Sequence, residues 1–448
     1  MLLILSCNNE KDSLEVDSVS VSLEVDSVIP VFSNDPVDNL NDSQNLDSDK
    51  SSKLTIKQSF ISALNEISNE TAWFLFGFRG LIPPEEPFLV QEVSQDLFKR
   101  IRGEDIKTGS MDIVYEKDEK LYKFLGFLDP KDKLGSIYLN LITEQIPGFY
   151  SLTTGLIHVV ADTEEIAIND ALLLAFVQGL AMQESHFQIS NQRSSVLDNR
   201  DTLLSIDALS IGDSLLSIGF YGSNRFPEAN LDELRINKSG DVFQNAPTIV
   251  QQMFLFPFTF GIEYVHALRL IGGWGEVNSA YSRLPHSSTE IIHPQKYIER
   301  FTPNIISINN FSRKLPENWK LIQSDVWGEF LLLLWLGANM DGENAAKASS
   351  GWLGDKYALI QNEISGNQSL VLALEWESNL EAEEFIQFLS GSLDKLNFNG
   401  ESNWKGILQH PVERFVVIEK NKSMVLLIIS SEEESADSLM REFDERME

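Results

Sequence analysis

Apolar residues recur along much of the chain at intervals of three and four, which is the spacing of an amphipathic helix. A first helix is expected to begin near Leu54, and the stretch Pro-Pro-Glu-Glu-Pro at 83–87 then interrupts the helical pattern. A later apolar helix contains Pro257, where the pattern predicts a kink. The further helices are expected at 88–103, 110–128, 170–187, 203–221, 248–271 and 380–396, and an acidic helix is expected to close the chain.

Other stretches are short, rich in β-branched and aromatic residues, and bounded by turn residues, which predicts strands. The turn at 153–155 predicts a hairpin in the first half of the chain. Strand pairs are expected at 148–152 with 156–160, 356–361 with 369–376, and 415–419 with 424–430. The predicted fold class is α+β: a mostly helical body over 53–300 with a small hairpin sheet, and a part over 301–448 that begins helical and ends as a ββαββα-like unit.

The first fifty residues have a different composition. Residues 1–7 form a short apolar run that ends in Leu-Ser-Cys, and this run resembles the end of a bacterial lipoprotein signal peptide with Cys7 as the lipidation site. The run is shorter than such signals usually are, so we expect a start codon further upstream. Residues 8–52 are acidic and rich in Ser and Asn, and the segment at 13–19 is repeated at 22–28, so we expect a disordered tether.

The charge of the chain limits its partners. The formal net charge is -32, and Lys and Arg form no extended cluster, so nucleic acid and anionic membrane surfaces would be repelled. The one cysteine excludes an intrachain disulfide. No stretch is expected to span a bilayer, and the most apolar one, 330–336, is predicted to be a buried helix core. We therefore expect contact with a membrane only through a lipid anchor.

A series of short motifs, in this order, resembles a family of bacterial and archaeal zinc-peptidase-like proteins of gluzincin type. No single motif is decisive, but their order and spacing across residues 70–390 are specific. The motifs are FRGLIPP at 78–84, GFLDP at 126–130, PGFYSLTTG at 147–155, ALSIGD at 208–213, FPFTFG at 256–261, GGWGEVN at 272–278, STEIIHPQKY at 288–297 and GWLGDKY at 351–357.

The resemblance implies where a zinc site would lie. In that family the helix after the hairpin carries His-Glu-x-x-His, in which two His on one helix face bind Zn²⁺ and the Glu acts as base; a second helix supplies the third ligand. Here the corresponding helix reads AFVQGLAMQESHF at 175–187. Phe176 and Leu180 stand at the positions of the two His, Val177 replaces the Glu, and Ile211 replaces the third ligand.

All four replacements are apolar, and apolar side chains offer Zn²⁺ no lone pair. The resemblance therefore implies a peptidase scaffold without catalytic residues, metal or other cofactor. We expect these four side chains to pack together, with Gly179 in the same helix permitting the close approach of a neighbour.

No His-x-x-x-His spacing occurs among the six histidines, so each is expected to be structural or at the surface. A remnant cleft is nevertheless expected beside the helix at 170–187. Its candidate residues are Tyr150, His158, Glu184, His186 and Asp213.

Three functions are consistent with these observations. The first is a catalytically inactive, lipid-anchored pseudopeptidase outside the cytoplasmic membrane, which binds a peptide, a protein or a peptidase that it regulates. The second is a hydrolase with a rearranged site that uses His158, Glu184 and His186. The third is a structural envelope protein without a ligand. An open groove beside the helix at 170–187 would favour the first.

Overall fold

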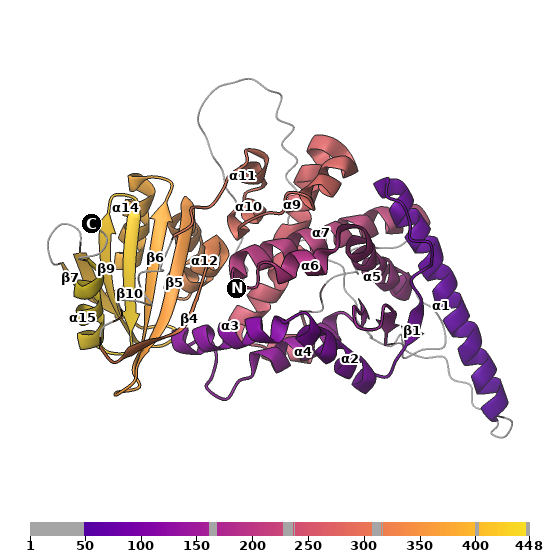
Figure 1. Cartoon of the computed structure of the whole chain (residues 1–448), viewed down its shortest axis with the longest axis horizontal. Helices are drawn as coiled ribbons and strands as arrows, with labels where there is room; N and C mark the ends of the chain where they lie inside the picture. The colour runs from indigo at the N-terminus through magenta and orange to yellow at the C-terminus, as the bar shows by residue number, and fades with distance from the viewer. Residues whose placement is uncertain are drawn as a thin grey trace.

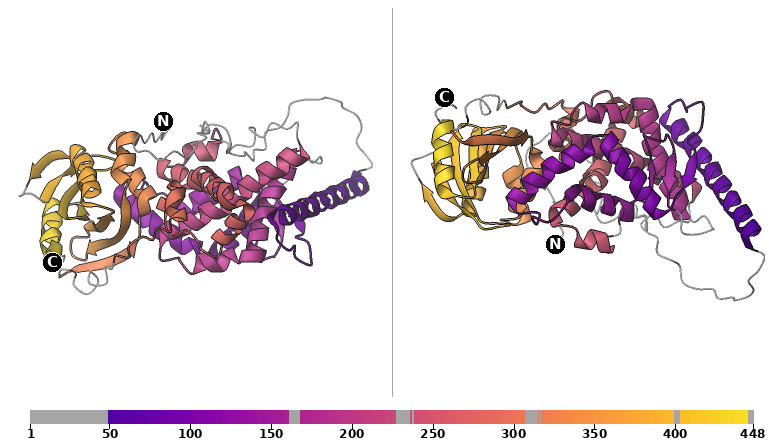
Figure 2. Two further views of the ribbon diagram at one scale, coloured as in Figure 1. Left: turned by 90° about the horizontal axis from the view of Figure 1, so that it is seen from above. Right: turned by 60° about the horizontal axis from the view of Figure 1, so that its bottom comes forward.

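A computed structural model describes residues 49–160, 168–226, 236, 238–306, 315, 317–398 and 403–444. The fold is α+β, as predicted, with a helical body and a sheet at one end of the long axis (Figures 1 and 2). Cys7, the repeat and most of the expected tether lie outside the described residues. The last part of that tether segment is helical, since the first helix begins at Asp49 rather than near Leu54.

The body contains eleven described helices and three short strands. They are α1 (Asp49–Arg79), β1 (Val90–Glu92), α2 (Gln95–Thr108), α3 (Met111–Leu125), α4 (Leu134–Gln145), β2 (Gly148–Tyr150), β3 (Ile157–Val159), α5 (Ile168–Phe187), α6 (Ile189–Ser194), α7 (Arg200–Arg225), α8 (Asp241–Asn245), α9 (Thr248–Ala280), α10 (Ser288–Ile292) and α11 (Pro294–Ile298).

The predicted hairpin is present as β2 and β3, which pair antiparallel. The prediction of a helix over 88–103 is wrong in its first part, because 90–92 form β1, which pairs in parallel with β3. Phe88, Val90 and Val93 are buried, and the Val90 N–H donates to Asn65 Oδ1 at 2.9 Å. Pairing with a distant strand and with α1 therefore overrides the local helical pattern. The helix starts only at α2, where the Ser94 side chain caps it.

The three long apolar helices α5, α7 and α9 form the centre of the body and agree with the predicted spans. The expected kink at Pro257 is wrong: non-helical dihedrals occur instead at Gly272 and Gly273. Gly273 has φ +63°, a backbone conformation that favours glycine. The kink therefore lies where the chain has a flexible pair of glycines, and the helix around Pro257 stays regular.

Helices α7 and α9 cross with their backbones in close contact. A Cβ atom on Gly212 would lie 2.1 Å from the carbonyl oxygen of Gly261, and a Cβ on Gly261 would lie 2.3 Å from that of Ala208. On the other side of α7, a Cβ on Gly179 of α5 would lie 2.8 Å from Ser214 Oγ. Glycine at these positions thus sets the spacing of the three central helices.

The C-terminal part is a seven-stranded antiparallel sheet with four helices. Its strand order is β4-β5-β6-β10-β9-β8-β7. Helix α14 ends at Gly391, and 394–398 form β7, so the prediction of a helix over 380–396 is too long. The elements are β4 (Trp319–Asp325), α12 (Gly328–Gly337), α13 (Gly342–Ser349), β5 (Trp352–Asn362), β6 (Gln368–Trp376), α14 (Asn379–Gly391), β7 (Asp394–Phe398), β8 (Asn403–Leu408), β9 (Arg414–Asn421), β10 (Met424–Ser430) and α15 (Glu433–Asp444).

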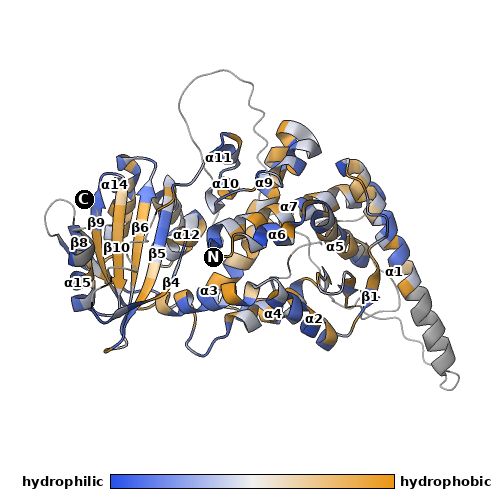
Figure 3. Ribbon diagram, viewed as in Figure 1, coloured by the Kyte–Doolittle hydropathy of each residue, from blue (hydrophilic) through white to orange (hydrophobic). Residues whose placement is uncertain are grey.

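Both faces of the central strands are covered, which explains the continuous apolar runs at 370–374 in β6 and 424–429 in β10 (Figure 3). On β10, Leu427 packs in the cluster that includes Phe385 of α14 and extends into the body. Leu426 and Ile428, which point to the other face, pack with Leu439 of α15. The alternation of strand side chains thus divides one apolar run between two cores.

The sheet is joined to the body through partly buried polar contacts. The Arg200 N–H donates to Asp325 Oδ1 at 2.9 Å, and the guanidinium of Arg414 donates to the carbonyl oxygen of Phe124. Within the body, Asp201 of α7 accepts the Ser288 N–H of α10 at 3.0 Å, and burial raises the pKa of Asp201 to about 8, which favours its protonated form.

By length and composition alone, α7 and α9 could cross a membrane, contrary to the expectation from the sequence that no stretch could. In the structure, 72% of the apolar window of α7 and 44% of that of α9 are buried inside the molecule. Core helices of globular domains meet the same criterion, so the pair is weak evidence of a membrane protein.

The glycine crossing predicts that Gly261→Ala is strongly destabilising. The added methyl would overlap the backbone of Ala208, so α7 and α9 would have to separate, at a cost of about 3 kcal/mol in the free energy of unfolding. Gly219→Ala is the matched control, because Gly219 lies in α7 with open space at its Cβ position; it should be neutral or stabilising by up to about 1 kcal/mol. Denaturant unfolding measures both, and equal stabilities for the two variants would contradict the crossing.

Candidate functional site

A cavity of about 290 Å³ lies in the body between the central helices and the layer formed by α2, α3, α4 and β2. Apolar and aromatic side chains make up most of its wall. Leu152, which is 43% exposed, lines it as well, so we place the opening to solvent there. The wall includes Phe176 and Leu180 from α5, Ile211 from α7, Met253 and Phe258 from α9, and Tyr138 from α4.

Three of the four positions that the resemblance assigns to the lost zinc site line this cavity. Phe176 and Leu180 are one helical turn apart on the same face of α5, and Ile211 approaches from α7. Val177 points elsewhere: its side chain is fully buried in the core and does not line the cavity. All four side chains belong to one apolar cluster, as expected, but they do not fill the space: Phe176, Leu180 and Ile211 border a cavity that is lined on another side by α2.

Of the five residues expected in a remnant cleft, Tyr150 and Glu184 line the cavity. The carboxylate of Glu184 is already occupied by Ser190, whose N–H donates to Oε2 at 2.9 Å and whose hydroxyl donates to Oε1 at 2.5 Å. The Glu184 carboxylate therefore stabilises the short connection between α5 and α6 and is not free to act as a general base.

The two histidines are placed elsewhere. His158 is buried in β3, with Nε2 2.8 Å from Thr154 Oγ1 and the ring against Phe149, and burial lowers its pKa. His186 is exposed at the end of α5, with its ring edge-to-face against Phe187. Neither lines the cavity, so the structure does not assemble the histidine site considered for a rearranged hydrolase.

Asp213 is fully buried behind the cavity wall and does not line it. Its Oδ1 is 2.5 Å from Arg79 Nη1, and its Oδ2 accepts a hydrogen bond from the hydroxyl of Tyr281 at 2.6 Å. Gln183 Nε2 is 3.3 Å from the same oxygen. This residue therefore holds helices together instead of facing a ligand.

Apart from Glu184, the charged residues of the cavity were not predicted. Two of its arginines are paired: Arg193 Nη1 is 2.6 Å from Asp207 Oδ1, and Arg200 Nε donates to Asp118 Oδ2 at 2.8 Å. In the third, Arg102, the Nε atom is buried and has no hydrogen-bond partner among the residues that the structure describes. Its guanidinium lies 4.9 Å from the centre of the Phe149 ring, and burial lowers its pKa.

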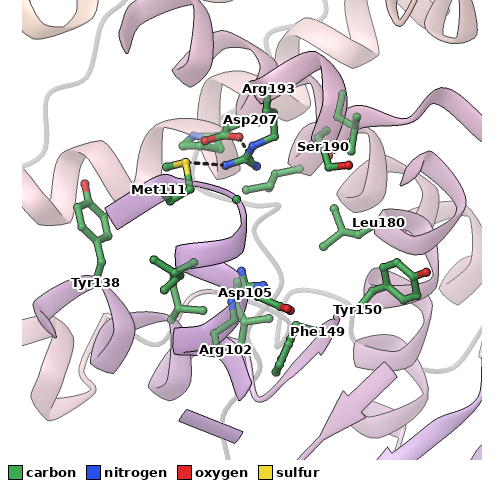
Figure 4. A pocket seen from close by; sticks show the side chains of 18 of the residues that line it. Arg102, Asp105, Met111, Tyr138, Phe149, Tyr150, Leu180, Ser190, Arg193 and Asp207 are labelled. Carbon is green, nitrogen blue, oxygen red and sulfur yellow. Dashed lines mark hydrogen bonds and ion pairs between the residues drawn. The ribbon is translucent and has the colours of Figure 1, made fainter. Parts of the chain in front are cut away.

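Asp105 lies one turn after Arg102 on α2 and is 8% exposed. Its Oδ1 accepts from the hydroxyls of Ser151 and Thr153 and from the Thr153 N–H at 3.1, 2.5 and 3.2 Å, which orders the turn between β2 and β3. Its Oδ2 has no hydrogen-bond partner within the described part of the chain. Figure 4 shows Arg102 and Asp105 on one side of the cavity, opposite Arg193 and Asp207.

The sequence does not identify Arg102 and Asp105 as cavity residues. Both belong to the highly charged segment at 99–105, which is typical of a solvated helix face. Within the described residues, no three His, Cys, Asp or Glu side chains are grouped as a metal site requires. The arrangement is that of a mainly apolar cavity with charged side chains at opposite places in its wall.

Comparison with known proteins gives one partial match. Residues 319–440 match the model of a domain of unknown function, DUF8575. The matched stretch covers the seven-stranded sheet, α12 to α14 and most of α15, and it excludes the cavity. No curated protein and no solved structure matches the chain.

Proposed function

We propose that this protein is a non-catalytic binding protein on a metallopeptidase-like scaffold, held outside the cytoplasmic membrane by lipid on Cys7. Its ligand, a peptide or an exposed segment of a protein, enters the cavity beside α5. The protein then acts by binding, either as a receptor or as a regulator of a partner such as a peptidase.

The observation that supports this proposal is the cavity itself. Phe176, Leu180 and Ile211 stand where the resemblance would place zinc ligands, and they line an open space of about 290 Å³. A scaffold kept only for structural support would gain free energy by filling that space, since an unfilled cavity costs packing energy. An apolar cavity with a few polar groups is typical of a small-ligand site.

Filling the cavity should remove binding without unfolding the protein. Leu180→Trp places an indole in the open space and should weaken binding of the neutral fluorescent probe N-phenyl-1-naphthylamine by at least about tenfold. Leu270→Trp is the matched control, because Leu270 is 71% exposed and lies outside the cavity wall. Fluorescence titration measures both variants; a probe that binds equally well to the Leu180→Trp variant does not occupy the cavity.

Introducing zinc-binding side chains tests whether Phe176, Leu180 and Ile211 correspond to the zinc ligands of the peptidase family. The triple variant Phe176→His, Leu180→His, Ile211→Glu places three metal-binding side chains on the wall of one cavity, and one zinc per chain is expected. Val177 is left unchanged because it does not face the cavity. The control omits Leu180→His and should lose most of the metal. Mass-spectrometric metal analysis gives the stoichiometry, and zinc bound by the unmodified chain would refute the proposed loss of the site.

The lipid anchor is tested on Cys7. In cells that express the complete reading frame, the unmodified protein should partition into the membrane and incorporate labelled fatty acid, and Cys7→Ser should abolish both, because Cys7 is the one thiol in the chain. A Ser6→Ala variant, which keeps a small residue before the cysteine, serves as control. Membrane association that persists in the Cys7→Ser variant would show that another feature carries it.

A further inference from the structure

The side of the cavity formed by α2 offers a donor and an acceptor next to each other. Arg102 and Asp105 are one turn apart on α2, and both line the cavity (Figure 4). Among the described residues, Arg102 Nε is buried without a hydrogen-bond partner and provides a donor, and Asp105 Oδ2, which is likewise buried and without a partner, provides an acceptor. A buried polar atom that lacks a partner costs about 1–3 kcal/mol, so a ligand that satisfies both atoms recovers this free energy.

The remaining charged groups of the cavity are largely satisfied by the protein. Arg193 is paired with Asp207, and Glu184 accepts two hydrogen bonds from Ser190. Arg200 is paired through Nε, although its Nη1 has no partner. Among the charged groups of the cavity, Arg102 and Asp105 are therefore the pair most available to form hydrogen bonds with a ligand.

The charge balance argues against a simple anion as ligand. Three arginines line the cavity, but so do three carboxylates, and one of them, Asp105, lies next to Arg102. A carboxylate ligand at Arg102 would be repelled by Asp105. A neutral group that accepts at one end and donates at the other meets no such repulsion.

We infer that the cavity binds a short peptide unit with an apolar side chain. The peptide carbonyl accepts from Arg102, the adjacent N–H donates to Asp105 Oδ2, and the side chain packs against Phe176, Leu180 and Ile211. The volume of about 290 Å³ limits the enclosed part to one or two residues. This inference rests on the proposed function, since it names the chemical class of ligand for the same cavity.

The test uses the whole chain and N-acetyl-L-phenylalanine amide, a neutral peptide unit with an apolar side chain. Calorimetric titration should show binding, and Arg102→Met and Asp105→Asn should each weaken it by about tenfold or more. Asp105→Asn keeps an oxygen for Ser151 and Thr153 but replaces Oδ2 with a donor, so the turn is retained and the melting temperature checks this. The controls Arg100→Met and Glu104→Gln change exposed residues of the same helix and should leave binding unchanged.

Comparison with 3-phenylpropionate decides between a peptide unit and an anion. If the cavity is an anion site, the carboxylate binds more tightly than the amide and Asp105→Asn strengthens its binding, and either result would overturn the inference. If N-phenyl-1-naphthylamine binds in a manner blocked by Leu180→Trp but the amide does not bind, the proposed function stands and the inference fails. If neither probe binds, both fail.

Discussion

The body is organised around one buried ion pair, between Arg79 at the end of α1 and Asp213 in the middle of α7. Both side chains are completely shielded from solvent. Tyr281, just after α9, and Gln183 of α5 donate to the same carboxylate, so four helices meet at this point. Removing one partner of a buried pair leaves an uncompensated charge, which typically costs about 3–5 kcal/mol.

The Arg79–Asp213 pair also helps to keep the neighbouring cavity open. Asp213 is two residues after Ile211 on α7 and therefore points to another face of that helix, and neither Asp213 nor Gln183 lines the cavity. Because the network and the glycine crossing fix the spacing of α5, α7 and α9, the apolar wall cannot collapse freely toward α2. The cavity therefore persists although its wall is apolar.

The sequence pattern predicted the elements whose local signal is strong. The spans of α5 and α7, the hairpin of β2 with β3, and the pairs β5 with β6 and β9 with β10 all agree with the structure. The elements that were missed are short or depend on distant partners. Among them, β1 exists because it pairs with β3, β4 adds to the edge of β5, and β7 and β8 extend the sheet beyond β9. Helix α4, although longer, was also missed.

By itself, the sequence determined the fold class, the positions of the long central helices and the apolar character of Phe176, Leu180 and Ile211, because hydrophobic periodicity and residue type are local properties. Only the tertiary structure decided that these side chains border an open cavity and that Val177, His158, His186 and Asp213 do not. It also decided that Arg102 and Asp105 line the cavity with polar atoms that have no partner among the described residues. The physical reason is that burial and pairing depend on which distant segments meet. A charged helix such as α2 has the same local pattern whether it faces water or a cavity.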